Sequence, residues 1–370
     1  MPKVCILTSV HMALDIRIFH KQAKTLAKAG YDITLIAQHD KDEVVDGVKV
    51  IALPRPTNRL LRILGTWNIY NLALKQRADI YHFHDSELLP AGLLLKLTTK
   101  SKVIYDVHED VPKDILTKRW IPSVFRMPLA YLFDKLEKKI SSRLDYVVTA
   151  TDSIEKNFEG VIKVVTINNY PILLLIKQSS VRVPRQVIVI YTGILCEERG
   201  ISEIVRAMAC LDSSKNVRLR LYGKFDPVSY REKITKLEGF DRVEYLGWIR
   251  PEFMWQKMSN ATAGIVCFHP YPNHINAMPN KIFEYMAAGL PVIASNFQLW
   301  REIVEGNNCG LTVNPLNPGE IAGAITYLME HSEKARKMGD NGRKAVLEKY
   351  NWENEGKKLL DLYKHLLPKG

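Results

Sequence analysis

A cation and a carboxylate lie three positions apart in residues 279–295, which read PNKIFEYMAAGLPVIAS. Lys281 and Glu284 would share one face of a short helix, because side chains three apart are neighbours on a helix surface. Pro279 and Gly289 predict the limits of this helix. The free N–H groups of a helix N-terminus bind phosphate, and a carboxylate accepts hydrogen bonds from hydroxyls. The segment therefore suits a ligand with phosphate and hydroxyl groups, although an amphipathic helix with two solvated charges has the same pattern.

Glycines and cations also follow several predicted strands in the second half of the chain. Three glycines come after apolar runs, where a missing side chain lets the backbone approach a ligand; they are Gly193, Gly223 and Gly247. Arg199 and Lys224 follow two of them, and together with Lys281 they predict a diphosphate site. No GxGxxG follows the first predicted strand and the chain has no P-loop motif, which disfavours the common dinucleotide dehydrogenases and kinases.

Strand-like and helix-like segments alternate along nearly the whole chain. Apolar runs such as KVCILTS, YDITLIA, VIVIYTG and TAGIVCF are separated by helical patterns. This alternation indicates an α/β protein with parallel sheets covered by helices on both faces. We predict two Rossmann-like domains facing across a cleft, with ligands beyond the carboxyl ends of the strands. The predicted parts are a first domain over 1–172, a linker over 173–186, a second domain with the diphosphate site over 187–345, and a C-terminal helix over 346–370 that packs back toward the first domain.

Composition narrows the class of protein and its compartment. The chain has 370 residues, 46% hydrophobic and 25% charged, which is typical of a globular protein with more than one domain. Five scattered cysteines without a CxxC pair predict neither a zinc site nor a disulfide framework, and favour a reducing, cytoplasmic location. The opening MPKVCILTS is too short for a signal peptide and predicts a first strand. A formal net charge of +12 indicates an anionic partner.

Part of this positive charge lies in residues 113–143, which hold eight Lys or Arg against three Asp or Glu. Five apolar residues recur there at helical spacing, namely Phe125, Leu129, Leu132, Leu136 and Ile140. A basic amphipathic helix can lie on an anionic membrane, and the same stripe can instead pack on the sheet of the first domain. Nucleic acid is not the predicted partner, because basic and aromatic residues are not interleaved on one face.

In combination, these motifs resemble the retaining glycosyltransferases of family 4, or glycosyltransferase group 1, which have the GT-B fold. The second half carries the resemblance through YTG…ERGISEIVRAM, VEYLGWI, NKIFEYMAAGLPVIAS and LWREIVEGNNCGLTVNPLNPGEIAGAI. The first half is similar more loosely, through AKTLAKAGYDITLIAQ, YHFHDSELLPAG and IYDVHED. The resemblance implies retaining transfer of a hexose from a nucleoside-diphosphate sugar to a glycan or lipid-linked acceptor, in cell-surface polysaccharide synthesis and without a metal or other cofactor.

The resemblance also implies roles for individual residues. Glu284 matches the second glutamate of the family's E-x7-E motif, which holds the ribose, and the backbone at Asn280 and Lys281 would face the diphosphate. Arg199 takes the place of a family lysine that binds the donor. Trp248 and Ile249 lie where the nucleobase is held. His108 matches a histidine of the first domain that lies close to the donor sugar and the acceptor, and is the predicted catalytic residue.

The chain departs from the family pattern at two positions. Asn276 stands where the first glutamate of the motif is expected, so His274 or Asn276 is predicted to contact the donor sugar instead. Ile194 replaces a frequent arginine, and Lys224 or Lys281 would supply the lost charge. An epimerase or sugar-phosphate synthase of the same fold, and a catalytically idle nucleotide-sugar binder, remain alternatives.

Two further groups of polar residues come from the first half. Asp15 and Arg17 are expected either to contact the acceptor or the donor phosphate, or to pair with each other. His82, His84 and Asp85 end one predicted strand, and His108 ends the next. Histidines and carboxylates together are typical metal ligands. We predict no metal here, because the resemblance implies metal-independent transfer in which cations neutralise the diphosphate, and an inward histidine can hydrogen-bond to backbone.

Overall fold

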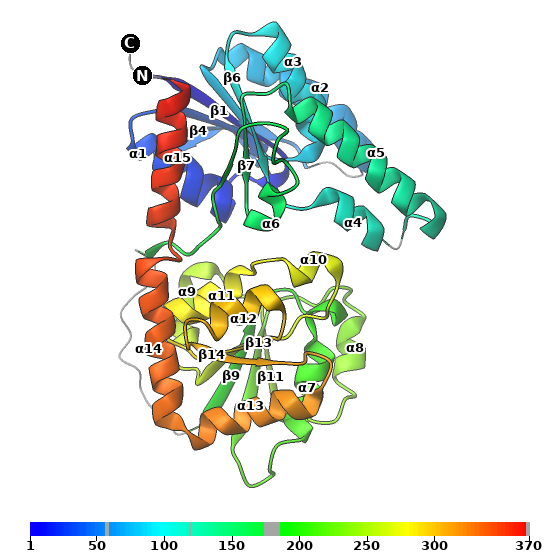
Figure 1. The fold of residues 1–370 in the computed structure, drawn as a ribbon, viewed down its shortest axis with the longest axis vertical. Coiled ribbons are helices and arrows are strands. Elements are labelled where there is room, and N and C mark those ends of the chain that lie inside the picture. Colours follow the sequence, from blue (N-terminus) through cyan, green and yellow to red (C-terminus); the bar gives the residue numbers. More distant parts are fainter. Residues whose placement is uncertain (56–58, 119, 174–185, 368–370) are drawn as a thin grey trace. The chain divides into compact units, whose positions relative to one another are not determined.

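The two compact units of the computed structural model are described over residues 1–55, 59–118, 120–173 and 186–367. One unit is Met1–Asn169 together with Trp352–Gly370, and the other is Tyr170–Asn351. Figure 1 shows the elements of each unit with their labels. The predicted linker, residues 173–186, lies almost wholly outside the described residues.

An eight-stranded sheet forms the centre of the first unit, in the order β3-β4-β2-β1-β5-β6-β7-β8. Every neighbouring pair is parallel except β3 and β4. The strands are β1 (Lys3–Met12), β2 (Asp32–Gln38), β3 (Glu43–Val45), β4 (Val48–Leu53), β5 (Ile80–Phe83), β6 (Lys102–Val107), β7 (Tyr146–Thr149) and β8 (Val164–Thr166). Strand β5 is buried throughout, and β7 is buried except at Tyr146, because helices cover both faces of the sheet, as expected for a parallel arrangement.

The helices of the first unit contact one another in two groups. One group contains α2 (Arg59–Gln76), α3 (Leu89–Thr98), α4 (Val111–Thr117) and α5 (Ser123–Ser141); the other contains the π-helix η1 (Ile16–Ala23), α1 (Lys24–Lys28) and α15 (Trp352–Leu366). Short turns form η2 (Ser86–Leu88) and α6 (Asp152–Glu155). Hydrogen bonds tie α15 to this unit: Trp352 Nε1 donates to Thr25 Oγ1 at 2.9 Å, and Asn168 N donates to a Glu355 carboxylate oxygen at 2.8 Å.

In the second unit, six parallel strands follow the order β11-β10-β9-β12-β13-β14. They are β9 (Val187–Thr192), β10 (Val217–Tyr222), β11 (Val243–Gly247), β12 (Ala263–Val266), β13 (Val292–Ser295) and β14 (Gly310–Val313). The helices are η4 (Glu197–Arg199), α7 (Ile201–Ala209), α8 (Tyr230–Ile234), η5 (Phe240–Arg242), α9 (Pro251–Met258), α10 (Pro272–Ile275), α11 (Asn280–Ala287), α12 (Gln298–Val304), α13 (Pro318–Glu330) and α14 (Ser332–Glu348). Counted along the chain, this is the 3-2-1-4-5-6 order of the Rossmann fold. The prediction of two parallel-sheet α/β units is therefore confirmed.

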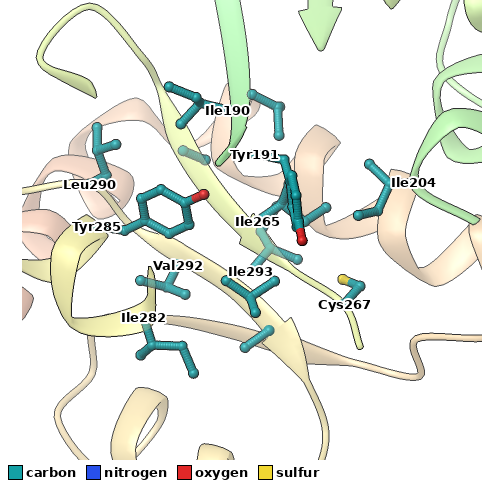
Figure 2. Close-up of a cluster of buried hydrophobic side chains, with 14 of the residues drawn as sticks. Ile190, Tyr191, Ile204, Ile265, Cys267, Ile282, Tyr285, Leu290, Val292 and Ile293 are labelled. Carbon is teal, nitrogen blue, oxygen red and sulfur yellow. The ribbon is translucent and has the colours of Figure 1, made fainter. Parts of the chain in front are cut away.

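The phosphate-binding helix predicted from the sequence is α11, and a tyrosine fixes it to the sheet. The ring of Tyr285 occupies the space that a side chain on Gly264 of β12 would take, with ring carbons 2.2 Å from an ideal Cβ there. Its hydroxyl accepts a hydrogen bond from Thr192 N at 3.0 Å. Figure 2 shows Tyr285 among apolar side chains of the strands and of α11. Pro279 is the N-cap residue of α11. Gly289 follows the C-terminal end of the helix at a φ of 74°, which a glycine adopts without strain.

The amphipathic stripe predicted over residues 113–143 lies largely on α5. Phe125, Leu129, Leu132 and Leu136 are exposed, and only Ile140 is buried. The alternative in which this stripe packs on the sheet is therefore wrong for four of its five residues. The face that does pack presents Ala130, Glu137, Ile140 and Ser141.

Candidate active site

In the second unit the strand order reverses between β9 and β12, and the predicted glycines converge at the carboxyl ends of the neighbouring strands. Gly193 N donates to the Tyr222 carbonyl at 2.7 Å, and Gly223 N donates to the Gly247 carbonyl at 2.8 Å. The loops pack so closely that a Cβ on Gly223 would lie 1.7 Å from the Gly193 carbonyl oxygen. Ligands of doubly wound sheets bind at this kind of reversal point.

Two cations converge on Gly193. A Cβ built there would lie 2.6 Å from Lys281 Nζ and 3.4 Å from Arg199 Nη1. Both cations also lie over the ring of Phe268, with Arg199 Cζ at 5.3 Å and Lys281 Nζ at 5.8 Å from its centroid. The β9 loop and the first turn of α11 therefore place two positive charges beside the half-buried backbone of Gly193.

The electrostatics of this point favour an anion. Burial and, second to it, the charge of the neighbouring Arg199 lower the pKa of Lys281 to about 8, against the opposing field of Glu284. Two like charges held together in a partly enclosed site repel each other, and an anion between them relieves that repulsion. Glu284 lies one turn along α11 from this point, on the same helix as Lys281.

The other predicted donor residues occupy three places in the second unit. Lys224 Nζ lies 6.0 Å from the centroid of the exposed Trp248 ring. Trp248 and Ile249 line a cavity of about 420 Å³ that also contacts β10, β11 and α9; the other lining residues are Arg220, Tyr222, Glu244, Leu246, Lys257 and Asn260. Asn276 is an exposed residue at the end of α10, whereas Asn280 is the first residue of α11.

His274 is less available than the sequence indicated. Its Nδ1 lies 3.0 Å from the His269 carbonyl oxygen, so this nitrogen is the donor. Burial lowers the pKa of His274, which keeps the ring neutral. Only its second ring nitrogen, Nε2, is left for a ligand.

In the first unit, the reversal point lies between β1 and β5, and a chain of histidines follows it. His84 Nδ1 and His108 Nε2 are 2.7 Å apart, and the rings of His82 and His84 stack at 4.8 Å. Burial lowers the pKa of His108 to about 4, so the ring is neutral at pH 7. His108 is the least buried of the three, with 17% of its side chain exposed.

A buried carboxylate, Asp106, lies behind these histidines. It accepts hydrogen bonds from Arg17 Nη2 at 2.9 Å and from Gln22 Nε2 at 2.6 Å. Burial alone would raise its pKa, but Arg17 and the histidines hold it well below the usual value. On the far side of His82, the Tyr363 hydroxyl of α15 lies 2.8 Å from Nδ1.

Sequence reasoning missed Asp106 and Tyr363. The signal for Asp106 was present in VIYDVH, because a carboxylate at an inward position of an apolar strand requires a buried partner. No comparable signal marked Tyr363, which is 281 residues from His82 along the chain.

Asp15 and Arg17 do not pair through their charged groups. The Asp15 carboxylate accepts hydrogen bonds from the backbone N–H of Arg17 and of Ile18, and so caps the first turn of η1. The Arg17 guanidinium is buried between Asp106 and the Ile167 carbonyl. Asp85, in turn, accepts hydrogen bonds from Ser9 N at 2.6 Å and Thr8 Oγ1 at 2.7 Å, which secures the end of β1.

Within the part of the chain that the structure describes, the grouping with metal-ligand geometry is His82, His84 and Asp106. Its ligand atoms lie within 4.8 Å of one another. Each Asp106 oxygen, however, already accepts a hydrogen bond, one of them from a guanidinium. A cation there would lie beside Arg17, so these residues fit a neutralised buried carboxylate better than a metal centre.

Comparison with known families settles the class of this protein. The model "Glycosyltransferase Family 4" matches residues 17–169, and "Glycosyl transferases group 1" matches residues 174–345. The chain belongs to the group 1 / family 4 glycosyltransferases. Its two parallel-sheet units are accordingly those of a GT-B glycosyltransferase.

Individual relatives of the transferase are distant. The MMP alpha-(1->4)-mannosyltransferase of Mycolicibacterium hassiacum is 23% identical over 302 residues, covering 78% of this chain and 71% of the relative. Sucrose-phosphate synthase from Thermosynechococcus elongatus has the same fold, with a TM-score of 0.81, 22% identity and 99% of each chain covered. Anabaena HepE in complex with UDP-glucose has a TM-score of 0.73 and 16% identity, over 99% of this chain and all of HepE.

We predict that Asp106→Asn destabilises the transferase by about 3–5 kcal/mol, because it leaves the buried Arg17 without a neutralising charge. The free energy of unfolding in urea measures this. The control is Asp46→Asn, which removes an exposed ion pair with Lys24 and should cost less than about 1 kcal/mol. Equal effects of the two substitutions would show that Asp106 is not the charge that stabilises the first unit.

We predict that UDP and GDP bind at these two cations and that their affinity falls roughly tenfold between pH 7 and pH 9. Lys281 loses its proton as the pH rises through its pKa of about 8, whereas anion binding requires the charged form. Isothermal titration calorimetry measures the affinity across this range. In Lys281→Met the affinity should be lower at pH 7 and nearly constant with pH; a variant with the slope of the parent would contradict the assignment.

Proposed function

We propose that this transferase moves a hexose from a nucleoside-diphosphate sugar to a glycan or lipid-linked acceptor, with retention at the anomeric carbon. The observation that carries the proposal is the convergence of Arg199 and Lys281 on Gly193, at the reversal point of the second sheet. A departing nucleoside diphosphate carries the charge that these two side chains would stabilise.

The remaining donor contacts of the proposal use other groups of the second unit. Glu284 would accept hydrogen bonds from the two ribose hydroxyls, and the backbone N–H groups at Asn280 and Lys281 would contact phosphate oxygens. The cavity beside Trp248 and Ile249 has the flat aromatic surface that suits a nucleobase. The donor of the proposal is a hexose nucleotide because one relative is named a mannosyltransferase and one structural neighbour was solved with UDP-glucose.

His108 is proposed to hydrogen-bond to the transferred sugar. A pKa of about 4 makes it a poor proton carrier at pH 7, whereas a neutral imidazole still donates one hydrogen bond and accepts another. No side chain is nominated as a nucleophile. Charge stabilisation of the leaving group is the larger catalytic contribution under this proposal.

The acceptor and the place of action follow from the resemblance. We propose a role in polysaccharide synthesis on the cytoplasmic side of the membrane, with peripheral contact between the protein and anionic lipid. Asn276 in place of a glutamate keeps a catalytically idle nucleotide-sugar binder as the rival. Slow hydrolysis of the donor without an acceptor would support the transferase and exclude that rival.

Glu284→Gln should weaken donor binding roughly 10- to 150-fold, since a hydrogen bond to a charged group contributes about 1.5–3 kcal/mol. A panel of UDP- and GDP-hexoses is titrated into the parent to find the donor that binds most tightly. The dissociation constant of that donor is then compared between the parent and Glu284→Gln. Glu333→Gln, an exposed glutamate in the first turn of α14, is the matched control and should bind like the parent. If both variants keep the parental affinity, Glu284 does not hold the ribose.

Transfer is proposed to need no metal, because the side chains of Arg199, Lys224 and Lys281 neutralise the diphosphate. Activity with the donor found above should therefore change less than twofold after dialysis against EDTA. Activity that is lost in EDTA and restored by Mg²⁺ or Mn²⁺ would overturn this part of the proposal, and would direct attention back to His82, His84 and Asp106.

A further inference from the structure

The first half of α5 exposes an unusual run of large apolar side chains. Phe125 is 57% exposed, Met127 75% and Leu132 64%. Val124, Leu129, Tyr131 and Leu136 are exposed as well, and Trp120 stands in the connection from α4. Surfaces of soluble proteins seldom expose so many contiguous large apolar residues unless something covers them.

These side chains extend around the helix as well as along it. At 100° per residue, the arc from Met127 through Val124 and Leu132 to Leu129 spans roughly 200°. A helix that packs on one protein surface needs a stripe of about 100°. The apolar arc of α5 is twice that wide. It therefore suits lipid chains, which can surround a helix, better than one rigid protein surface.

Before α5, the charge of Lys118 is paired with Asp114 of α4 at 2.9 Å. Along α5, charge follows the apolar residues. Residues 124–132 of α5 hold one basic residue, Arg126, whose Nε donates to the Ile121 carbonyl. The next turns bring Lys135, Lys138 and Lys139, with Lys135 Nζ 5.5 Å from the centroid of the Tyr131 ring. An apolar end, then a tyrosine, then lysines is the order in which a helix meets the hydrocarbon, the interface and the anionic headgroups of a bilayer.

The base of α5 is fixed to the first unit, whereas its beginning projects from it. Glu137 is buried and accepts a hydrogen bond from the Tyr105 hydroxyl at 2.7 Å, and Ile140 and Ser141 are buried beside it. In Figure 1, α4 and the N-terminal half of α5 extend beyond the sheet of the first unit as a helical hairpin. The N-terminal half of α5 can therefore enter a lipid bilayer without any rearrangement of the core of the first unit.

We propose that the α4–α5 hairpin inserts its apolar end into one leaflet of an anionic membrane, with Lys135 and Lys139 at the headgroups. Nine residues, 124–132, span about 13 Å, close to half of the roughly 30 Å hydrocarbon thickness. None of the helices searched among the described residues has the length and apolarity needed to span a bilayer.

The test is co-sedimentation with vesicles of phosphatidylglycerol and phosphatidylcholine, without donor or acceptor. The parent should bind anionic vesicles, bind pure phosphatidylcholine much more weakly, and dissociate as salt rises. Phe125→Ser/Leu132→Ser should reduce binding at least thirtyfold. Val228→Ser/Leu347→Ser, which changes two exposed apolar residues of the second unit, should bind like the parent.

A charge pair of variants tests the lysines separately. Lys135→Gln/Lys139→Gln should weaken binding to anionic vesicles roughly thirtyfold, at about 1 kcal/mol for each basic residue near the surface. Lys337→Gln/Lys344→Gln removes the same net charge from exposed positions on α14 and should have little effect. Thermal unfolding and donor binding, both measured without lipid, show that each variant is folded. A failure of the membrane inference therefore leaves the proposed transfer reaction standing.

Three results would overturn the inference. Equal binding by the parent and Phe125→Ser/Leu132→Ser would mean that the hairpin does not enter the membrane. An equal loss of vesicle binding in the α5 and α14 lysine variants would mean that net charge, and not the position of Lys135 and Lys139, determines binding. The third result is a parent that does not bind vesicles but forms concentration-dependent dimers, which Phe125→Ser/Leu132→Ser abolishes. That result would assign the apolar surface to a second copy of the chain.

Discussion

The proposed donor site of this transferase depends on the absence of a side chain at Gly193. With a φ of 123° and a Cβ position already within 2.6 Å of Lys281 Nζ, no other residue fits there without moving the cation. Gly223 and Gly200 meet the same condition, since a Cβ on either would lie within 2 Å of a carbonyl oxygen of a neighbouring loop. Backbone therefore packs on backbone at the strand ends, and the space left open is the one into which Arg199 and Lys281 project.

The first unit is organised by the opposite problem, a charge that must be buried. Asp106 lies inside β6, and the cost of removing its carboxylate from water is offset by Arg17 and Gln22 of η1. The same carboxylate stands 3.5 Å from His108 Nε2 and 3.4 Å from His82 Nε2. One buried charge thus positions a helix and three histidines, whereas the second unit reaches comparable order by close packing of uncharged backbone.

The sequence was informative where function and local geometry require the same residue. The limits of α11 could be predicted from Pro279 and Gly289, and the alternation of strands and helices from the hydrophobic period. The three glycines at the strand ends do lie together. Long-range partners were not predictable, because neither composition nor period links Arg17 to Asp106 or His82 to Tyr363. The stripe on α5 could not be resolved either: periodicity specifies that a helix has an apolar face, but burial depends on what lies against it.

The attachment of α15 to the first unit has a consequence for biosynthesis. Residues Tyr170–Asn351 are contiguous, so the second unit has its whole sequence before the first unit does. Until Trp352–Leu366 leave the ribosome, His82 lacks its tyrosine, Asn168 N lacks the Glu355 carboxylate and Thr25 lacks the Trp352 indole. Chains usually fold from the N-terminus as they are made. Here the N-terminal half is synthesised first, but it obtains three of its polar partners only after all residues of the second unit have been made.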